Sequence, residues 1–313
     1  MELTTEKTVS TTIRKVINDF LFHCEYEKNL SKKTIKAYQT DLEQFIQSTH
    51  NKLFYESSIY EINKDILKEY IQYLSCFQSK TSKRKIASLK AMLNFFEFEN
   101  EAFINPFRRI KVKIKEPLIL PTVMHINEVK KVLQLLYNEY HKNNHTDGYK
   151  AKAQLRNIAI VELLFATGIR VSELCDLRCS DIDLRNGSIK VFGKGSKERI
   201  IQICQKDVLS ALKEYHKAVK PDTFFFVNRL GNQTSTQSVR LLVKRYVKLT
   251  KINKKVTPHT IRHTFATLLL EENVDIKYIQ SLLGHSSIAT TQIYTHVNTR
   301  KQILFNKKGL IGY

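Results

Sequence analysis

Apolar residues recur at helical spacing through residues 11–99, and this pattern constrains the fold more than any other feature of the chain. Side chains three or four positions apart share one face of a helix, so each run predicts an amphipathic helix. Four such runs are present, and Ser31 precedes the second as an N-cap residue would. None is long enough to be stable alone, so the helices must pack together. The apolar positions are Ile13, Val16, Ile17, Phe20, Leu21; Ile35, Tyr38, Leu42, Phe45, Ile46; Ile66, Tyr70, Ile71, Leu74; and Ile86, Leu89, Met92, Leu93, Phe96.

Strand patterns appear in the second half of the chain. Short β-rich runs separated by Asn186-Gly187 and by a Gly-Lys-Gly-Ser turn predict a small antiparallel sheet. Helices are predicted on both sides of it, so the expected fold class is mainly α with a small antiparallel β-sheet. The predicted strands are 181–184, 188–192 and 199–203; the predicted helices lie near 127–140, 155–166 and 172–177, with a polar loop at 141–152, and two more helices surround a short FFFVN strand within 207–252.

Residues 105–121, NPFRRIKVKIKEPLILP, interrupt the helical pattern. Prolines near both ends and alternating basic and aliphatic residues predict an extended linker. The chain of 313 residues suits two domains. We therefore predict an N-terminal domain at 11–104, a basic linker at 105–121 and a C-terminal domain at 122–313.

The charge balance points to a polyanionic partner. The chain has 51 Lys and Arg against 30 Asp and Glu, a formal net charge of +21, which favours nucleic acid. A membrane surface is the weaker alternative, because no stretch approaches ~18 uninterrupted apolar residues. The N-terminus lacks an apolar signal core, so we expect a cytoplasmic protein without membrane association. The five cysteines form no paired CxxC motifs and are expected to be reduced structural residues.

Basic residues gather on the polar faces of the predicted helices and in the linker. A single lysine on such a face is ordinarily just solvated. Few acids accompany the group at 80–90, however, so contact with DNA phosphates is the favoured interpretation. The residues expected to contact DNA are Lys32, Lys33, Lys83, Arg84, Lys85, Arg108, Arg109 and Lys244.

Residues 257–297 carry the densest set of chemically competent side chains. His259 and Arg262 are three apart on a predicted helix and project toward one target, which we expect to be an anion. Gly284 is placed to end the next helix and leave His285 at an exposed turn. Tyr294 follows; its free pKa is near ~10, so it needs neighbouring cations or a base to act as a nucleophile.

Two plainer interpretations of this stretch remain. Tyr294 can be an ordinary half-buried aromatic residue. His259 and His263 lie four apart and can bind zinc, but Thr260 stands where the metalloprotease motif has Glu, so we expect no metal.

Two further positions favour a phosphate-binding site. Gly168 ends an apolar helix just before Arg170 and can turn that guanidinium out of the core. Glu173, three residues on, either orients Arg170 or complements the helix dipole. Lys194 lies between two glycines in the predicted hairpin turn and can reach into a groove, and Lys197 is the rival for that role.

Four segments together resemble the tyrosine recombinases, most closely the Xer-type and phage-integrase-type bacterial members. They occur in family order over most of the C-terminal half: ATGIRVSEL at 166–174, FGKGSKERI at 192–200, HTIRHTFAT at 259–267 and LLGHSSIATTQIYTHV at 282–297. The resemblance implies the catalytic set Arg170, Lys194, His259, Arg262, His285 and Tyr294. It also implies that the N-terminal helices form a SAM-like core-binding domain that clamps duplex DNA, and that the C-terminal tail helps to assemble tetramers on two duplexes.

The resemblance further implies a reaction. Tyr294 would attack a DNA phosphate held by Arg170 and Arg262 and form a 3′-phosphotyrosine, with Lys194 protonating the leaving 5′ oxygen. Because the linkage keeps the bond energy, rejoining would need no ATP, metal or other cofactor. The alternatives are a type IB topoisomerase that swivels one strand and a catalytically silent DNA-binding protein.

Overall fold

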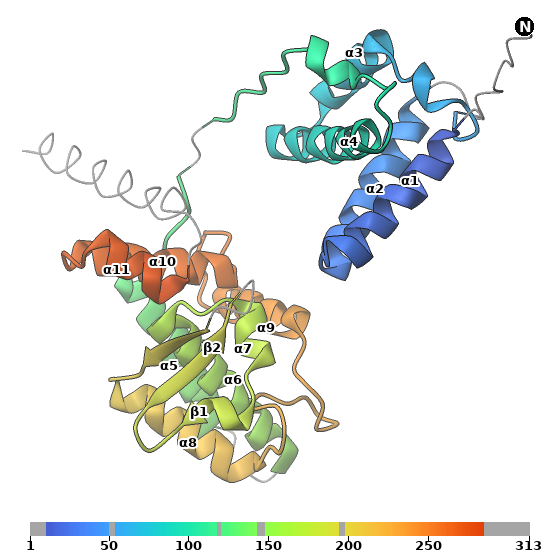
Figure 1. The fold of residues 1–313 in the computed structure, drawn as a ribbon. Helices are drawn as coiled ribbons and strands as arrows, with labels where there is room; N and C mark the ends of the chain where they lie inside the picture. Colours follow the sequence, from blue (N-terminus) through green and yellow to red (C-terminus); the bar gives the residue numbers. More distant parts are fainter. Residues whose placement is uncertain (1–10, 50–53, 118–119, 143–147, 194–197, 285–313) are drawn as a thin grey trace, which may run out of the picture. The chain divides into compact units, whose positions relative to one another are not determined.

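The computed structural model describes residues 11–49, 54–117, 120–142, 148–193 and 198–284. The chain divides into two compact units between Leu118 and Ile119 (Figure 1). Each unit has its own hydrophobic core. Both units are mainly helical, and the three strands belong to the second. The predicted fold class is therefore confirmed.

The first unit contains the four predicted helices. Ser31 caps the second, its Oγ accepting a hydrogen bond of 3.3 Å from the Thr34 amide. The fourth helix packs against the first two, and the apolar faces meet in one core that includes Phe20, Phe45 and Leu93. The helices are α1 (Ile13–Phe22), α2 (Lys32–Ser48), α3 (Lys64–Tyr73) and α4 (Ser79–Glu99).

The predicted linker does not begin as an extended segment. Pro106–Arg109 form a 3-10 turn, capped by the Asn105 side chain, which accepts from the Phe107 amide at 2.9 Å. Phe107 is buried in the first core, and Ile110 packs on it. Proline at the first helical position and asparagine as a cap stabilise a turn where the alternating pattern suggested a strand.

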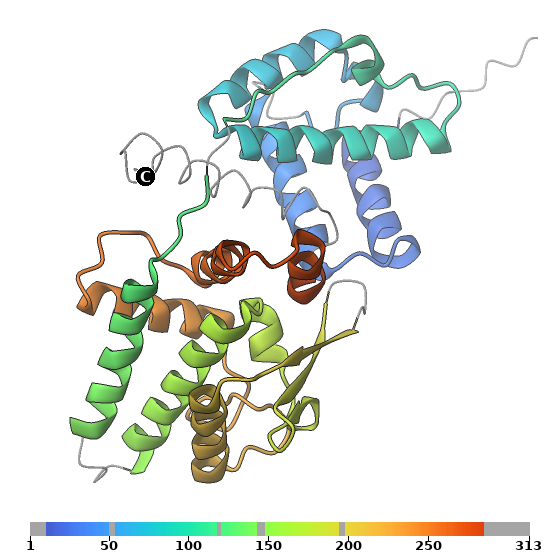
Figure 2. The same ribbon diagram turned by 90° about the vertical axis from the view of Figure 1, so that its left-hand side faces the viewer.

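One long helix, α6, organises the second unit. It contacts helices before and after it in the chain (Figure 2). Its buried residues run without a break from Ile158 to Leu164 rather than along one stripe. A helix covered on several sides has this pattern. The helices of this unit are α5 (Ile126–Lys142), α6 (Gly148–Thr167), α7 (Val171–Asp176), α8 (Lys206–Val219), α9 (Thr236–Leu249), α10 (Pro258–Glu271) and α11 (Ile276–Leu283).

The sheet has the predicted antiparallel order β1-β2-β3. In β2 and β3, Ile189 pairs with Ile201 and both are buried, whereas Lys190 pairs with the exposed Ile200. One face of the hairpin therefore belongs to the core. The strands are β1 (Ile182–Asp183), β2 (Ser188–Phe192) and β3 (Glu198–Gln202).

Two local predictions for this unit are wrong. The FFFVN segment is not a strand: it makes only isolated bridges, Arg178 with Phe224 and Val227 with Gln233. The predicted loop at 141–152 is partly helical, because α5 continues to Lys142 and α6 begins at Gly148. None of the helices described here is long and apolar enough to cross a membrane.

Candidate active site

Helix α10 presents two of the predicted site residues. Thr257 caps it through its hydroxyl, which accepts from the Thr260 amide at 3.2 Å, and His259 and Arg262 follow within the first two turns. Arg262 is 4% exposed. Its guanidinium donates to the Gly168 carbonyl at 2.8 Å and to the Leu283 carbonyl at 2.5 Å. Arg262 therefore joins α10 to the ends of two other helices.

Arg170 reaches the same place from the start of α7. Gly168 has φ +59°, the left-handed conformation that glycine adopts without strain, and turns the chain after α6. Arg170 is the N-cap of α7. Its guanidinium donates to Glu173 Oε1 and to the Gly284 carbonyl, both at 2.7 Å. The prediction that Gly168 turns the chain just before Arg170 is confirmed.

Glu173 is the acidic centre of the site. It is 7% exposed and accepts from the Arg170 amide at 3.0 Å as well as from the Arg170 guanidinium. Arg199, on β3, donates to both of its carboxylate oxygens, at 3.1 and 2.7 Å. Burial alone would raise the pKa of Glu173, but the hydrogen bonds and charge of Arg199 and the hydrogen bonds from Arg170 outweigh it and lower that pKa. Glu173 is thus an anion that both orients Arg170 and caps its helix.

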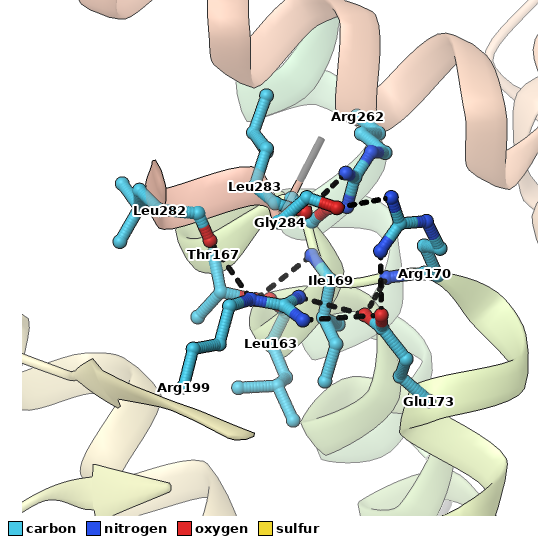
Figure 3. A network of polar contacts seen from close by, with 11 residues as sticks. Leu163, Thr167, Ile169, Arg170, Glu173, Arg199, Arg262, Leu282, Leu283 and Gly284 are labelled. Atoms are coloured by element: carbon cyan, nitrogen blue, oxygen red, sulfur yellow. Dashed lines mark hydrogen bonds and ion pairs between the residues drawn. The ribbon is translucent and has the colours of Figure 1, made fainter. Parts of the chain in front are cut away.

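The C-terminal end of α11 receives three guanidinium groups. Gly284 ends the helix with φ +64°, as predicted. Three consecutive carbonyls each accept from a different arginine: Leu282 from Arg199 at 2.9 Å, Leu283 from Arg262, and Gly284 from Arg170 (Figure 3). The last carbonyls of a helix lack partners within it and carry partial negative charge, so cations are favourable there.

The histidines of α10 are deprotonated more readily than free histidine. Burial, followed by Arg262, Arg240 and Arg170, lowers the pKa of His259, although much of its side chain remains exposed. Burial, followed by His259 and Arg262, lowers the pKa of His263 to about 4. Both imidazoles are therefore neutral at neutral pH. Within the described residues no group of His, Cys, Asp and Glu has a geometry suited to a metal ion.

The structure brings together Arg170, His259 and Arg262, which are separated by up to 92 positions in the sequence. Lys194, its rival Lys197, His285 and Tyr294 lie outside the described residues, as does the C-terminal tail. In the sequence, Lys194 stands between the end of β2 and the start of β3, and His285 directly follows Gly284. Arg199 was not predicted as a site residue, although it lies in the predicted strand at 199–203 and in the segment FGKGSKERI that carries part of the resemblance.

The residues on α2 and α4 that were predicted to contact DNA differ in how exposed their side chains are. Lys32 and Lys33 are exposed at the start of α2. Lys83 is also exposed and pairs with Glu116 at 3.0 Å. Arg84 is half-exposed and pairs with the buried Asp41.

Lys85 differs from its neighbours because it is 3% exposed. Its ammonium lies 3.6 Å from Asp41 and also donates to Gln44. A buried amine committed to an internal carboxylate is not available to a phosphate. This burial argues against the prediction that Lys85 contacts DNA.

The remaining predicted DNA contacts are on the surface. Arg108 is exposed and pairs with Glu97 at 2.9 Å, and Arg109 is exposed beside it. Lys244 is exposed on α9. These side chains remain candidates for phosphate contact.

Family models match both units of the chain. The model "Phage integrase family" matches residues 127–301, and the model "Phage integrase, N-terminal SAM-like domain" matches residues 17–100. The first match covers more than half of the chain and includes every predicted catalytic position.

Whole-length relatives agree with these matches. The chain is 44% identical over 297 residues to a tyrosine recombinase of Agathobacter rectalis, covering 93% of this chain and 95% of the relative. It is 36% identical over 300 residues to tyrosine recombinase XerC of Thermodesulfovibrio yellowstonii, covering 92% and 93%.

Solved structures share the fold. The XerH site-specific recombinase bound to palindromic difH substrate has a TM-score of 0.74 at 24% identity, covering 93% of this chain and 84% of that one. The lambda integrase tetramer bound to a Holliday junction has a TM-score of 0.70 at 17% identity, covering 92% and 78%.

Proposed function

Because the chain belongs to the phage integrase family of tyrosine recombinases, we propose that it is a site-specific recombinase that cuts and rejoins DNA through a covalent 3′-phosphotyrosine. The observation that supports this most is the meeting of Arg170 and Arg262 on the consecutive carbonyls of Gly284 and Leu283. Guanidinium groups that converge on adjacent carbonyls are placed to hold the non-bridging oxygens of one phosphate.

Each step of the cleavage reaction has a proposed residue. Tyr294 attacks the phosphorus, the bond to the 5′ oxygen breaks, and Lys194 gives that oxygen its proton. Arg170 and Arg262 stabilise the charge that develops on the phosphate. His285 donates a hydrogen bond to it in the transition state.

His259 is proposed to accept the proton of the attacking tyrosine. A general base must be unprotonated at the working pH. The lowered pKa of His259 meets this condition, because burial and the surrounding arginines disfavour the imidazolium form.

Rejoining reverses the same step. A 5′ hydroxyl attacks the phosphotyrosine, the new phosphodiester forms, and the tyrosine recovers its proton. The energy of the broken bond stays in the covalent intermediate. The residues named here therefore suffice without ATP or a metal ion.

The two units have separate proposed tasks on double-stranded DNA. Residues 11–104 form the core-binding domain, 105–121 the basic linker and 122–313 the catalytic domain. The solved relatives include a tetramer on a Holliday junction, and we propose the same assembly for this chain, with the C-terminal tail joining neighbouring subunits. The proposed location is the cytoplasm.

The first experiment isolates the covalent step. A binding site is selected from a library of inverted repeats around a random spacer, and a duplex bearing that site is nicked within the spacer so that the cleaved end diffuses away. Incubation with EDTA should give a covalent protein–DNA adduct that is stable in denaturing gels. Tyr294→Phe should bind the same duplex and give no adduct.

The outcomes separate the candidate functions. Equal behaviour of wild type and Tyr294→Phe would leave only a DNA-binding protein. An adduct without exchange between two marked sites would favour topoisomerase-like swivelling. An adduct with exchange supports the recombinase.

A further inference from the structure

Arg199 makes more contacts within the site than a residue supporting a strand needs. It is the second residue of β3, and its side chain is 12% exposed. One edge of its guanidinium donates to both oxygens of Glu173, and its Nε donates to the Leu282 carbonyl at 2.9 Å. A single planar group therefore connects β3, α7 and the end of α11 (Figure 3).

The partners of Arg199 are next to, or the same as, the partners of Arg170. The Arg170 guanidinium donates to Glu173 through one nitrogen and to the Gly284 carbonyl through another. Arg199 holds Glu173 directly and holds the backbone two residues before Gly284. Both groups that orient Arg170 are thus fixed by Arg199.

The close fit around Gly284 supports this arrangement. A Cβ on residue 284 would lie 3.1 Å from Arg199 Nη1 and 3.4 Å from its Cζ. The Arg199 guanidinium therefore packs directly against the backbone at the end of α11, and glycine at 284 leaves the space for it. A smaller side chain at 199 would leave the end of α11 without this support.

We propose that Arg199 is a positioning residue for DNA cleavage: it holds Glu173 and the end of α11 so that Arg170 meets the phosphate in the reactive geometry. This inference rests on the proposed function. Arg199 acts through these neighbours and not on the DNA. Its loss should slow cleavage while DNA binding, which depends on many surface contacts, is retained.

Three substitutions separate geometry from charge. Arg199→Gln removes the charge and the fork, Arg199→Lys keeps the charge but cannot reach two carboxylate oxygens and a carbonyl with one planar group, and Arg199→Ala leaves space for a free guanidinium ion. Arg185→Gln is the matched control, since Arg185 is exposed in the turn between β1 and β2 of the same sheet.

The measurement uses the nicked duplex described above, with adduct formation timed under single turnover and affinity measured separately. We expect Arg199→Gln to lower the rate on the order of 10²-fold, the usual effect of misplacing a reacting group by about 1 Å, with unchanged affinity. Arg199→Lys should recover part of the loss. Millimolar guanidinium should accelerate Arg199→Ala and leave wild type and Arg185→Gln unaffected.

Two results would overturn the proposal. One is a wild-type rate for Arg199→Gln. The other is a parallel loss of rate and affinity without recovery by Arg199→Lys or by guanidinium, which would show a purely structural role. Absence of an adduct with wild type and with Arg185→Gln would refute the proposed function itself, and this inference with it.

Discussion

Gly168→Ala tests whether the turn before Arg170 requires glycine. At φ +59° an alanine pays about 1–2 kcal/mol for the left-handed conformation. Its Cβ would also lie 2.6 Å from Phe265 Cδ1 and 3.1 Å from Leu283 Cδ2, and such overpacking typically costs about 1–3 kcal/mol more. The expected destabilisation is therefore about 2–5 kcal/mol. Because the Gly168 carbonyl accepts from Arg262, relief of the clash by a backbone shift would also move a site residue.

Gly231→Ala is the matched control, because Gly231 has φ +77° and no atom lies within 4 Å of its added Cβ. It should show only the conformational cost of about 1–2 kcal/mol. Unfolding of a chain with two units need not be two-state, so hydrogen exchange of α6 peptides is the measurement, which reports the free energy of opening of the second unit. Equal losses in the two variants would refute the argument from the Phe265 contact.

Four further substitutions test other parts of the structure. The pKa of His263 falls to about 4 in the folded chain, so the unfolded chain binds more protons between pH 4 and the usual pKa of histidine. The stability of the second unit should therefore fall on acidification through this window by up to about 1.4 kcal/mol per pH unit. Hydrogen exchange of α6 peptides in His263→Gln, compared at pH 7 and 5, should lack this part of the pH dependence. Lys85→Ala should destabilise the first unit by about 3 kcal/mol, because the buried Asp41 carboxylate loses a partner, and should not change the salt dependence of DNA binding. Lys33→Ala should instead reduce the slope of the salt dependence by about 1 without changing stability. The reverse pattern would show that Lys85 contacts DNA. Arg262→Lys should slow adduct formation on the order of 10²- to 10³-fold with affinity retained, since an ammonium cannot replace the fork; an unchanged rate contradicts its role at the phosphate.

Local patterns predicted the helices and the two helix ends that shape the site. Periodicity located the four helices of the first unit, because each buries one face against the others. Gly168 and Gly284 were recognisable because a left-handed residue after an apolar helical run is usually glycine. These signals depend only on residues close together in the chain.

The errors arose where burial depends on distant residues. The FFFVN run was interpreted as a strand, but Phe225 and Phe226 are buried in an irregular segment, and an apolar run alone does not reveal whether a strand partner exists. Lys85 belonged to a basic run that was interpreted as contacting DNA phosphates. Its partner Asp41 lies 44 positions away on another helix, so no local pattern identified the pair.

The convergence of three arginines has a physical explanation that the sequence alone does not display. Like charges repel, so Arg170, Arg199 and Arg262 need negative charge to stay close together. The Glu173 carboxylate supplies a full charge, and the last carbonyls of α11 supply partial charges and acceptors that the helix itself cannot pair. A DNA phosphate also presents oxygen acceptors with negative charge. The guanidinium groups that pair with the last carbonyls of α11 are therefore donors suited to phosphate, and the fold brings them together before DNA binds. Assembly in advance matters for catalysis, because donors already oriented need no reorganisation when charge develops on the phosphate.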